Sequence, residues 1–150
     1  MDAKTICVVD LISQMIIGQV NHETKIDWIE LSETAHKLLF RDKKMRLIVI
    51  DIYTGKKQTL LNNISFVQWV PQSDVVVAQS NSNLAIWYNI DLPEHLTLMP
   101  IRGEVLEVVR ENVSQGRLLH VIQLNQLHCI SGTYGSGIPG RTNRTYLPTR

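Results

Sequence analysis

The sequence predicts an all-β fold, namely a fragment of a β-propeller with about two and a half four-stranded blades and an irregular C-terminal tail. The first observation is a repeated four-residue phrase that joins two large strand-forming side chains to a short acid or amide and then an aliphatic residue. Its three copies start 41 and then 38 residues apart, at residues 8–11, 49–52 and 87–90. A period of roughly 40 residues is typical of WD40-type blades, and we expect the phrase to close the third strand of each blade.

The second observation is that the residues between the copies repeat as well. A tryptophan begins each unit, Trp28 and then Trp69, and these lie 41 residues apart because the first loop is three residues longer in the first unit. Differences of length that are confined to a loop are compatible with a structural repeat. Four positions recur at an offset of 38 residues: Leu38, Phe40, Asp42 and Leu47 correspond to Val76, Ala78, Ser80 and Ala85.

The N-terminal stretch predicts two strands rich in Val and Ile, at residues 5–11 and 15–20. They would be the last two strands of a blade that covers residues 1–22. The first complete blade is expected over residues 24–62, with strands at 25–31, 37–41, 46–53 and 58–61. Its third strand is apolar from Leu47 to Ile50, which suits a strand that neighbouring blades cover on both faces.

The second complete blade is expected over residues 64–101, and a further unit begins within residues 103–112. Pro93 and Pro100 bracket its outermost strand, where a missing amide donor does least harm. The apolar runs are short, β-branched and interrupted by turn residues, so they fit strands better than helices, which need capping residues and a 3.6-residue period. The strands expected here are 66–70, 74–79, 84–90 and 95–99, followed by 105–109.

Composition describes a soluble globular protein, with 44% hydrophobic and 19% charged residues. A formal net charge of +1 gives no reason to expect nucleic acid as a partner. The chain has no apolar run of about 18 residues, so we expect no insertion into a membrane. Cys7 and Cys129 lie far apart without ligand spacing, and we expect a reduced intracellular compartment.

The charges divide the chain at about residue 112. All 14 acidic residues and 11 of the 15 basic residues lie in residues 1–112, whereas residues 113–150 hold four arginines and no acid. We therefore predict two parts: a partial WD-repeat propeller at 1–112 and a separate, partly disordered tail at 113–150.

Six residues are expected to be structural members of the repeat. Asp42, Asp51 and Asn89 could suggest general acids or metal ligands, but a short acid or amide beside a hairpin turn usually accepts hydrogen bonds from nearby backbone amides. Trp28, Trp69 and Trp87 could mark a ligand-binding patch, but large aromatic residues at repeated strand positions more often fill the core between blades. We expect no catalytic, cofactor-binding or metal-binding residue.

An alternative function is a small nucleotide-binding or metal-binding protein that uses the tail. His120, His128 and Cys129 could supply part of a zinc site, but a structural site needs four ligands. The glycines between Gly132 and Gly140 resemble a phosphate loop, yet the required lysine and following helix are missing.

Four stretches of the sequence carry a resemblance to one family. They are residues 33–44 (ETAHKLLFRDKK), 68–79 (QWVPQSDVVVAQ), 85–90 (AIWYNI) and 100–103 (PIRG). These stretches closely resemble the large WD-repeat and helical-repeat subunits of the intraflagellar transport B complex, over about residues 1–112. The resemblance implies a non-catalytic scaffold that takes part in cilium assembly and intraciliary transport, with other transport subunits as partners and a location at the cilium, the ciliary basal body and the cytoplasm.

The sequence departs from this family after Asn112. Val113 and Ser114 are the residues that an in-frame splice-donor sequence GTAAGT encodes. We hypothesise that residues 113–150 are translated intron or an alternative last exon, which would make the chain a truncated isoform; a further alternative is that this isoform has no independent function. A genomic sequence with codons 112–114 inside one ordinary exon would exclude this origin.

Residues 116–130 are apolar without a clean period of 2.0 or 3.6, and we expect them to pair as strands on the incomplete third unit. An open arc of blades leaves apolar faces bare at both ends, so we also expect self-association through these faces. The loops at residues 32–36 and 80–83 are the predicted contacts with transport subunits.

Overall fold

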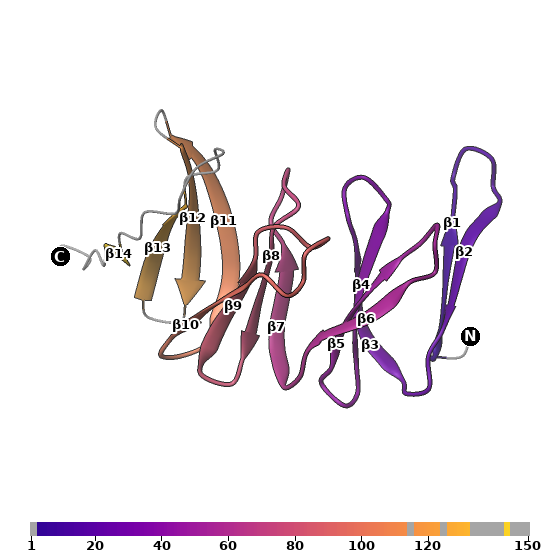
Figure 1. Ribbon diagram of the computed structural model, residues 1–150, viewed down its shortest axis with the longest axis horizontal. Coiled ribbons are helices and arrows are strands. Elements are labelled where there is room, and N and C mark those ends of the chain that lie inside the picture. Colours follow the sequence, from indigo (N-terminus) through magenta and orange to yellow (C-terminus); the bar gives the residue numbers. More distant parts are fainter. Residues whose placement is uncertain (1–2, 114–115, 124–125, 133–142, 145–150) are drawn as a thin grey trace.

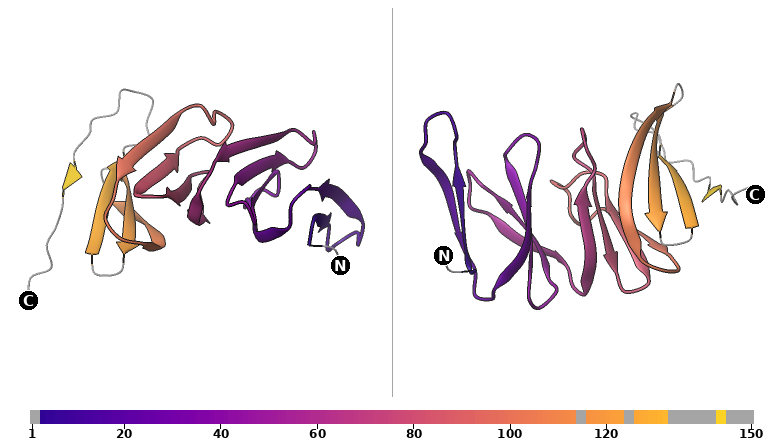
Figure 2. Two further views of the ribbon diagram at one scale, coloured as in Figure 1. Left: turned by 90° about the horizontal axis from the view of Figure 1, so that it is seen from below. Right: turned by 180° about the vertical axis from the view of Figure 1, so that it is seen from behind.

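The computed structural model describes residues 3–113, 116–123, 126–132 and 143–144. Every regular element in this part of the chain is a strand, which confirms the all-β prediction. The strands form one two-stranded and three four-stranded antiparallel sheets, in which strands that follow one another in the chain are neighbours. The sheets follow one another in chain order along an open arc, as blades of a partial propeller do (Figures 1 and 2).

We name the four sheets blades A to D. Blade A contains β1 (Thr5–Val9) and β2 (Ile16–Asn21). Blade B contains β3 (Ile26–Leu31), β4 (Lys37–Asp42), β5 (Leu47–Asp51) and β6 (Lys57–Leu61). Blade C contains β7 (Ile64–Trp69), β8 (Val76–Ser80), β9 (Asn83–Trp87) and β10 (Leu96–Pro100). Blade D contains β11 (Val105–Val113), β12 (Gly116–Gln123), β13 (Gln126–Gly132) and β14 (Asn143–Arg144).

Blades B and C repeat each other in their strand pairing. Glu30 pairs with Leu39 in blade B, and the residues 38 positions later, Gln68 and Val77, pair in blade C. Both first strands also carry an irregularity of register two residues after the strand begins. The 38-residue offset found in the sequence is therefore the structural offset of the first two strands.

The hydrophobic core lies between neighbouring blades rather than at one centre. Side chains of a strand alternate between its two faces, and in β5 Ile48 and Ile50 join the cluster shared with blade A, whereas Leu47 and Val49 join the cluster shared with blade C. A third cluster joins blade C to Val105 and Val108 of blade D. Because the third strand is buried on both faces, its sequence is continuously apolar, as predicted.

Blade D extends into the part of the chain that was expected to form the tail. β12 pairs with β11 over residues 116–123, and β13 pairs with β12 over residues 126–132. The expected pairing of residues 116–130 on the third unit is thereby confirmed. Most of the glycine-rich stretch lies outside the described residues, and the boundary at residue 112 stays a prediction.

Candidate functional site

The loops leave the blades at two opposite ends, because consecutive antiparallel strands run in opposite directions. The loop at residues 32–36 joins β3 to β4, and it lies at the upper end in Figure 1, with the loops that join the third and fourth strands of each blade. The loop at residues 80–83 joins β8 to β9 and lies at the lower end. One flat partner surface therefore cannot cover both of the predicted contact loops.

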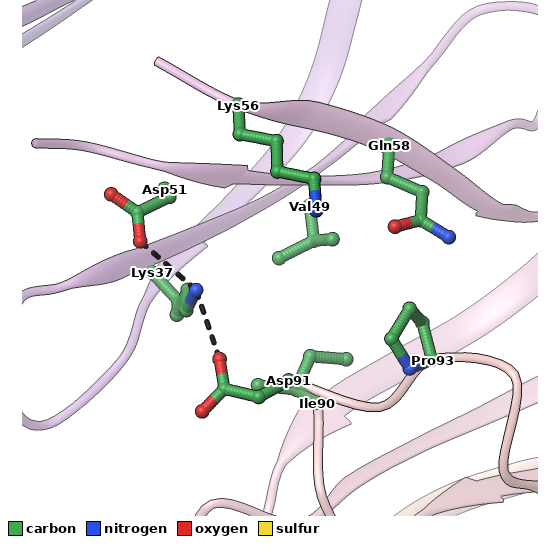
Figure 3. Close-up of a pocket in the computed structure, with 8 residues that line it drawn as sticks. All are labelled: Lys37, Val49, Asp51, Lys56, Gln58, Ile90, Asp91 and Pro93. Carbon is green, nitrogen blue, oxygen red and sulfur yellow. Dashed lines mark hydrogen bonds and ion pairs between the residues drawn. The ribbon is translucent and has the colours of Figure 1, made fainter. Parts of the chain in front are cut away.

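A small groove opens at the upper end, where blades B and C meet (Figure 3). Its volume of about 70 Å³ is far below that of pockets for small-molecule ligands, which hold several hundred Å³. The groove is large enough to take one side chain of a partner. The lining residues are Lys37, Val49, Asp51, Lys56 and Gln58 of blade B and Ile90, Asp91 and Pro93 of blade C.

Lys37 joins the two blades at this groove. Its Nζ lies 3.0 Å from Oδ2 of Asp51 in its own blade and 2.9 Å from Oδ1 of Asp91 in blade C, and Figure 3 shows it between the two carboxylates. Burial lowers the pKa of Lys37, but hydrogen bonds to Asp91 and Asp51 raise this pKa by more, so the net pKa lies above the usual value. Lys37 therefore stays charged at neutral pH, and its two ion pairs bridge blades B and C.

Aromatic and apolar side chains lie on the loops around the groove. The rings of His36 and Tyr53 lie 4.9 Å apart, centroid to centroid, and Tyr53 is 63% exposed. Leu92, next to the groove residue Asp91, is 42% exposed. Exposed aromatic side chains beside a polar cleft are typical of protein contact surfaces. The chemistry of this end therefore suits a protein partner.

The acid or amide of each repeated phrase ends the third strand in the same way. In every copy the side-chain oxygen accepts a hydrogen bond from the amide two residues later, which closes an Asx turn. The turn connects the third strand to the fourth, so this residue shapes the upper end of each blade. The acceptors and donors are Asp10 with Ile12 and Ser13, Asp51 with Tyr53 and Thr54, and Asn89 with Asp91.

Asp42 lies at the lower end and is fully buried. Its Oδ2 lies 2.9 Å from Nε2 of His22 and 2.8 Å from Nε of Arg46, and its Oδ1 accepts the amides of Lys44 and Arg46. Burial alone would raise the pKa of Asp42, but the hydrogen bonds from His22 and Arg46 hold it at about 2. The sequence reasoning missed His22 as a partner, because the two residues are 20 positions apart and no spacing motif relates them.

The three tryptophans lie at or beside the core between blades B and C. Trp87 is completely buried and Trp69 is 6% exposed, and both belong to that core, against which Trp28 packs. The indole Nε1 of Trp87 donates to the carbonyl of Pro93 at 3.1 Å, beside the groove. The buried indoles leave no open aromatic patch at these two positions.

Two strands of blade D, β12 and β13, contain the residues of the alternative site in the tail. His120 is paired with Cys129, and His128 is paired with Val121, along β12 and β13. Within the described residues, no group of three or more His, Cys, Asp and Glu side chains could hold a metal ion. The described part of the chain also contains no helix that could cross a membrane.

Comparison with known proteins gives clear relatives over most of the chain. The intraflagellar transport protein 172 homolog of Drosophila melanogaster is 82% identical over 112 residues, which is 75% of this chain. The homolog of Homo sapiens is 53% identical over 109 residues, and intraflagellar transport protein 172 of Chlamydomonas reinhardtii is 44% identical over 113 residues. The matched part is about three quarters of this chain and 6% of the length of each of these relatives. No protein-family model matches the chain.

The solved structure of U3-55K has a similar fold. It aligns with a TM-score of 0.56 at 8% sequence identity, over 85% of this chain and 42% of that chain. At this identity the likeness concerns the fold alone.

Proposed function

Because the chain matches intraflagellar transport protein 172 homologs over about three quarters of its length, we propose that it is a non-catalytic WD-repeat scaffold fragment of intraflagellar transport. Its role is to present propeller loops to protein partners, which are other subunits of the transport complex. The identity of 82% to the Drosophila relative is the observation that carries this proposal. The small volume of the groove supports contact with a side chain over binding of a small molecule.

The partner surface is the upper end of blades A to C. Tyr53 and Leu92 supply exposed apolar area there, and Lys37 bridges blades B and C through its ion pair with Asp91. The predicted contact loop at residues 32–36 belongs to this surface, whereas the loop at 80–83 would serve a separate contact at the lower end.

Binding of the purified 150-residue chain to reconstituted transport subunits tests the proposal. We expect the double variant Tyr53→Ala and Leu92→Ala to weaken the contact by at least tenfold, since exposed aromatic anchors dominate such interfaces. Arg102→Ala, at an exposed position between β10 and β11 at the lower end and outside both predicted contact loops, is the matched control and should leave the affinity unchanged. Absence of binding to every transport subunit at micromolar concentration would refute the transport role, and a loss caused by Arg102→Ala alone would refute the assignment of the surface.

The location follows from the same proposal. A fluorescently tagged chain in ciliated cells should collect at the cilium and the ciliary basal body, in addition to the cytoplasm. A uniform cytoplasmic signal that does not change when cilia assemble would count against the proposal.

The bare blade faces support a further part of the proposal, which is weak self-association. Val9 and its cross-strand partner Ile16 of blade A are 46% and 62% exposed, and Leu106 and Val109 of blade D are 53% and 39% exposed. Stacking of such faces removes apolar area from water. Sedimentation should therefore show a mass that rises with concentration, and a monomer at 100 µM would exclude it.

The separate origin of residues 113–150 remains part of the proposal. The Drosophila relative matches this chain over 112 residues, which equals the length of the predicted propeller part. Transcript sequencing across codon 112 tests the origin, because a retained intron or alternative exon must begin there.

A further inference from the structure

The groove between blades B and C contains a lysine, Lys56, that takes no part in the bridge between the blades. Nζ of Lys37 pairs with both carboxylates of the groove, those of Asp51 and Asp91. Asp51 is occupied further, because its Oδ1 accepts two backbone amides of the following turn. Nζ of Lys56 forms no ion pair with the residues that the structure describes. Each carboxylate therefore already has a cation, whereas Lys56 offers an unused positive charge.

The strand pattern places Lys56 and Gln58 on the groove side of β6. Alternate residues of a strand share a face, and Leu60, the next residue on this face, packs against the core between blades B and C. Lys57 lies on the opposite face, since it pairs with Ile50, which belongs to the cluster shared with blade A. Figure 3 shows the side chains of Lys56 and Gln58 reaching from blade B toward blade C. One ammonium group and one amide group thus enter the groove from the same strand.

The opposite wall of the groove is apolar, and its backbone is held in place. It contains Ile90 and Pro93, which lie in the loop that joins β9 to β10. The carbonyl of Pro93 accepts a hydrogen bond from Nε1 of Trp87 at 3.1 Å, and the amide of Asp91 donates to Oδ1 of Asn89 at 2.9 Å. These bonds lie within the fold, so the groove exists without a partner. Both of its walls belong to four-stranded blades.

The groups of the groove favour an acidic side chain over a basic one. A carboxylate accepts hydrogen bonds, and both the ammonium of Lys56 and the amide nitrogen of Gln58 can donate to it. A lysine or arginine would instead lie against Lys56, and it would find both carboxylates already paired with Lys37. The volume of about 70 Å³ admits one side chain, and the apolar wall suits an aliphatic stem.

We propose that this groove binds the side chain of a glutamate from a partner protein. The carboxylate pairs with Nζ of Lys56 and accepts a hydrogen bond from Gln58, while the methylene groups pack against Ile90 and Pro93. Glutamate has a longer aliphatic stem than aspartate, which the apolar wall requires. This inference rests on the proposed contact of the upper end with a transport subunit, and it names the side chain that enters the groove.

A small probe tests the groove without any partner. We would titrate N-acetylglutamate N-methylamide into the ¹⁵N-labelled 150-residue chain and follow the side-chain amide signals of Gln58. Saturable shifts are expected with this probe and none with the glutamine analogue, which has the same length and no charge. Equal shifts with both probes, or no shift with either, would overturn the carboxylate site and would leave the transport role unaffected.

Two neighbouring lysines separate the groove from the overall charge of the chain. Lys56→Gln removes the charge in the groove, and Lys57→Gln makes the same change of net charge on the opposite face of β6. We expect Lys56→Gln to weaken binding of the glutamate probe and of the transport subunit about fivefold, the effect of one partly exposed ion pair. Lys57→Gln should change neither affinity, and Lys56→Arg should bind as the unmodified chain does. Equal losses in the two glutamine variants would overturn the proposal.

A double-variant analysis identifies the glutamate on the transport subunit. Each surface glutamate of the bound subunit is replaced by glutamine in turn. One replacement should weaken binding to the unmodified chain about fivefold and have no further effect on the Lys56→Gln chain, because the two changes remove the same contact. If every replacement affects both chains equally, no glutamate enters the groove, and the proposal is overturned while the transport role stands. Absence of binding to every subunit would refute the transport role instead, and the small probe then decides the groove by itself.

Discussion

Gln68 forms two hydrogen bonds with the backbone of Val108, one through the oxygen and one through the nitrogen of its side-chain amide. Its Oε1 accepts the Val108 amide at 3.0 Å, and its Nε2 donates to the Val108 carbonyl at 2.8 Å. The two bonds connect the first strands of blades C and D. Glu30 has the equivalent position in blade B, where its Oε2 accepts the Trp69 amide at 3.2 Å. A carboxylate cannot donate, so the contact between blades B and C contains only half of this arrangement.

Glu30→Gln should make the chain more stable. Burial raises the pKa of Glu30 in the folded state, which shows that its charge is unfavourable there. Glutamine removes the charge from this half-buried position, keeps the acceptor and adds a donor. We expect the free energy of unfolding at pH 7 to rise by about 1 kcal/mol, the usual net value of one hydrogen bond. Urea unfolding followed by tryptophan fluorescence measures it.

The reverse exchange in blade C is the control for this prediction. Gln68→Glu places a carboxylate against the Val108 carbonyl and should lower the free energy of unfolding by about 2 kcal/mol, because a buried acceptor loses its donor. A stabilising Gln68→Glu, or a destabilising Glu30→Gln, would contradict the comparison of the two blades.

Asp42→Ala should destabilise the chain more than the equivalent change in blade C. The substitution leaves His22 and Arg46 without their shared carboxylate, and breaking a buried ionic contact costs about 3 kcal/mol or more. The counterpart Ser80 makes a neutral bond to the Asn62 carbonyl at 2.8 Å, so Ser80→Ala should cost about 1 kcal/mol. Urea unfolding of both variants gives the comparison, and equal losses would show that the charges of the Asp42 cluster add nothing.

The stability of the chain should fall in acid because two carboxylates, Asp42 and Asp51, take up protons. Hydrogen bonds hold the pKa of Asp42 at about 2, and the amide of Thr54 together with Lys37 holds that of Asp51 well below its usual range. Both folded-state values lie below the unfolded value of about 4, so their contribution is complete above about pH 5 and is lost as the pH falls toward 2. Glu30 has the opposite effect on stability: because its folded-state pKa is raised, its unfavourable contribution to stability decreases as the pH falls.

Thermal unfolding between pH 6 and pH 2 measures this dependence. The melting temperature of the unmodified chain should fall steadily below pH 5. Asp51→Asn should melt lower at pH 6 and lose less on acidification, since it has no proton to take up at that site. A variant with the same slope as the unmodified chain would exclude Asp51 as a source of the acid sensitivity.

Much of the fold could be predicted because repeated residues report on local structure. The third strands were found from the repeated phrase whose third residue is Asp10, Asp51 or Asn89, since a short acid or amide that forms an Asx turn marks the point where the strand ends. The predicted correspondence between Leu47 and Ala85 was wrong, because the third strands of blades B and C are displaced by one residue from the 38-residue repeat. Leu47 faces blade C, whereas Ala85 faces blade B, because the turn before β9 is shorter and a slip of one residue reverses the face of a strand.

The contacts between blades could not be predicted in this way. Lys37 meets Asp91 from 54 positions away, and His22 meets Asp42 only because the loop between blades A and B folds over the β4–β5 turn. Such pairs depend on how neighbouring sheets stack, and neither the repeat period of the sequence nor the spacing between residues predicts this stacking. In blade D the pairing of residues 116–130 was predicted but the strand bounds were not, since these residues lack the alternation that marks a half-buried strand.

Ala35→Gly should stabilise the chain by removing strain from the loop between β3 and β4. Ala35 has a φ of +57°, and this left-handed conformation costs a residue with a Cβ atom about 1 kcal/mol. Gly55, in the neighbouring turn, has a φ of +71° and open space where a Cβ would lie. Gly55→Ala should therefore lower the free energy of unfolding by about 1 kcal/mol, while Ala35→Gly raises it by up to that amount. Because no atom would contact a Cβ at Gly55, opposite signs in urea unfolding identify the backbone as the cause, and equal signs would reject it.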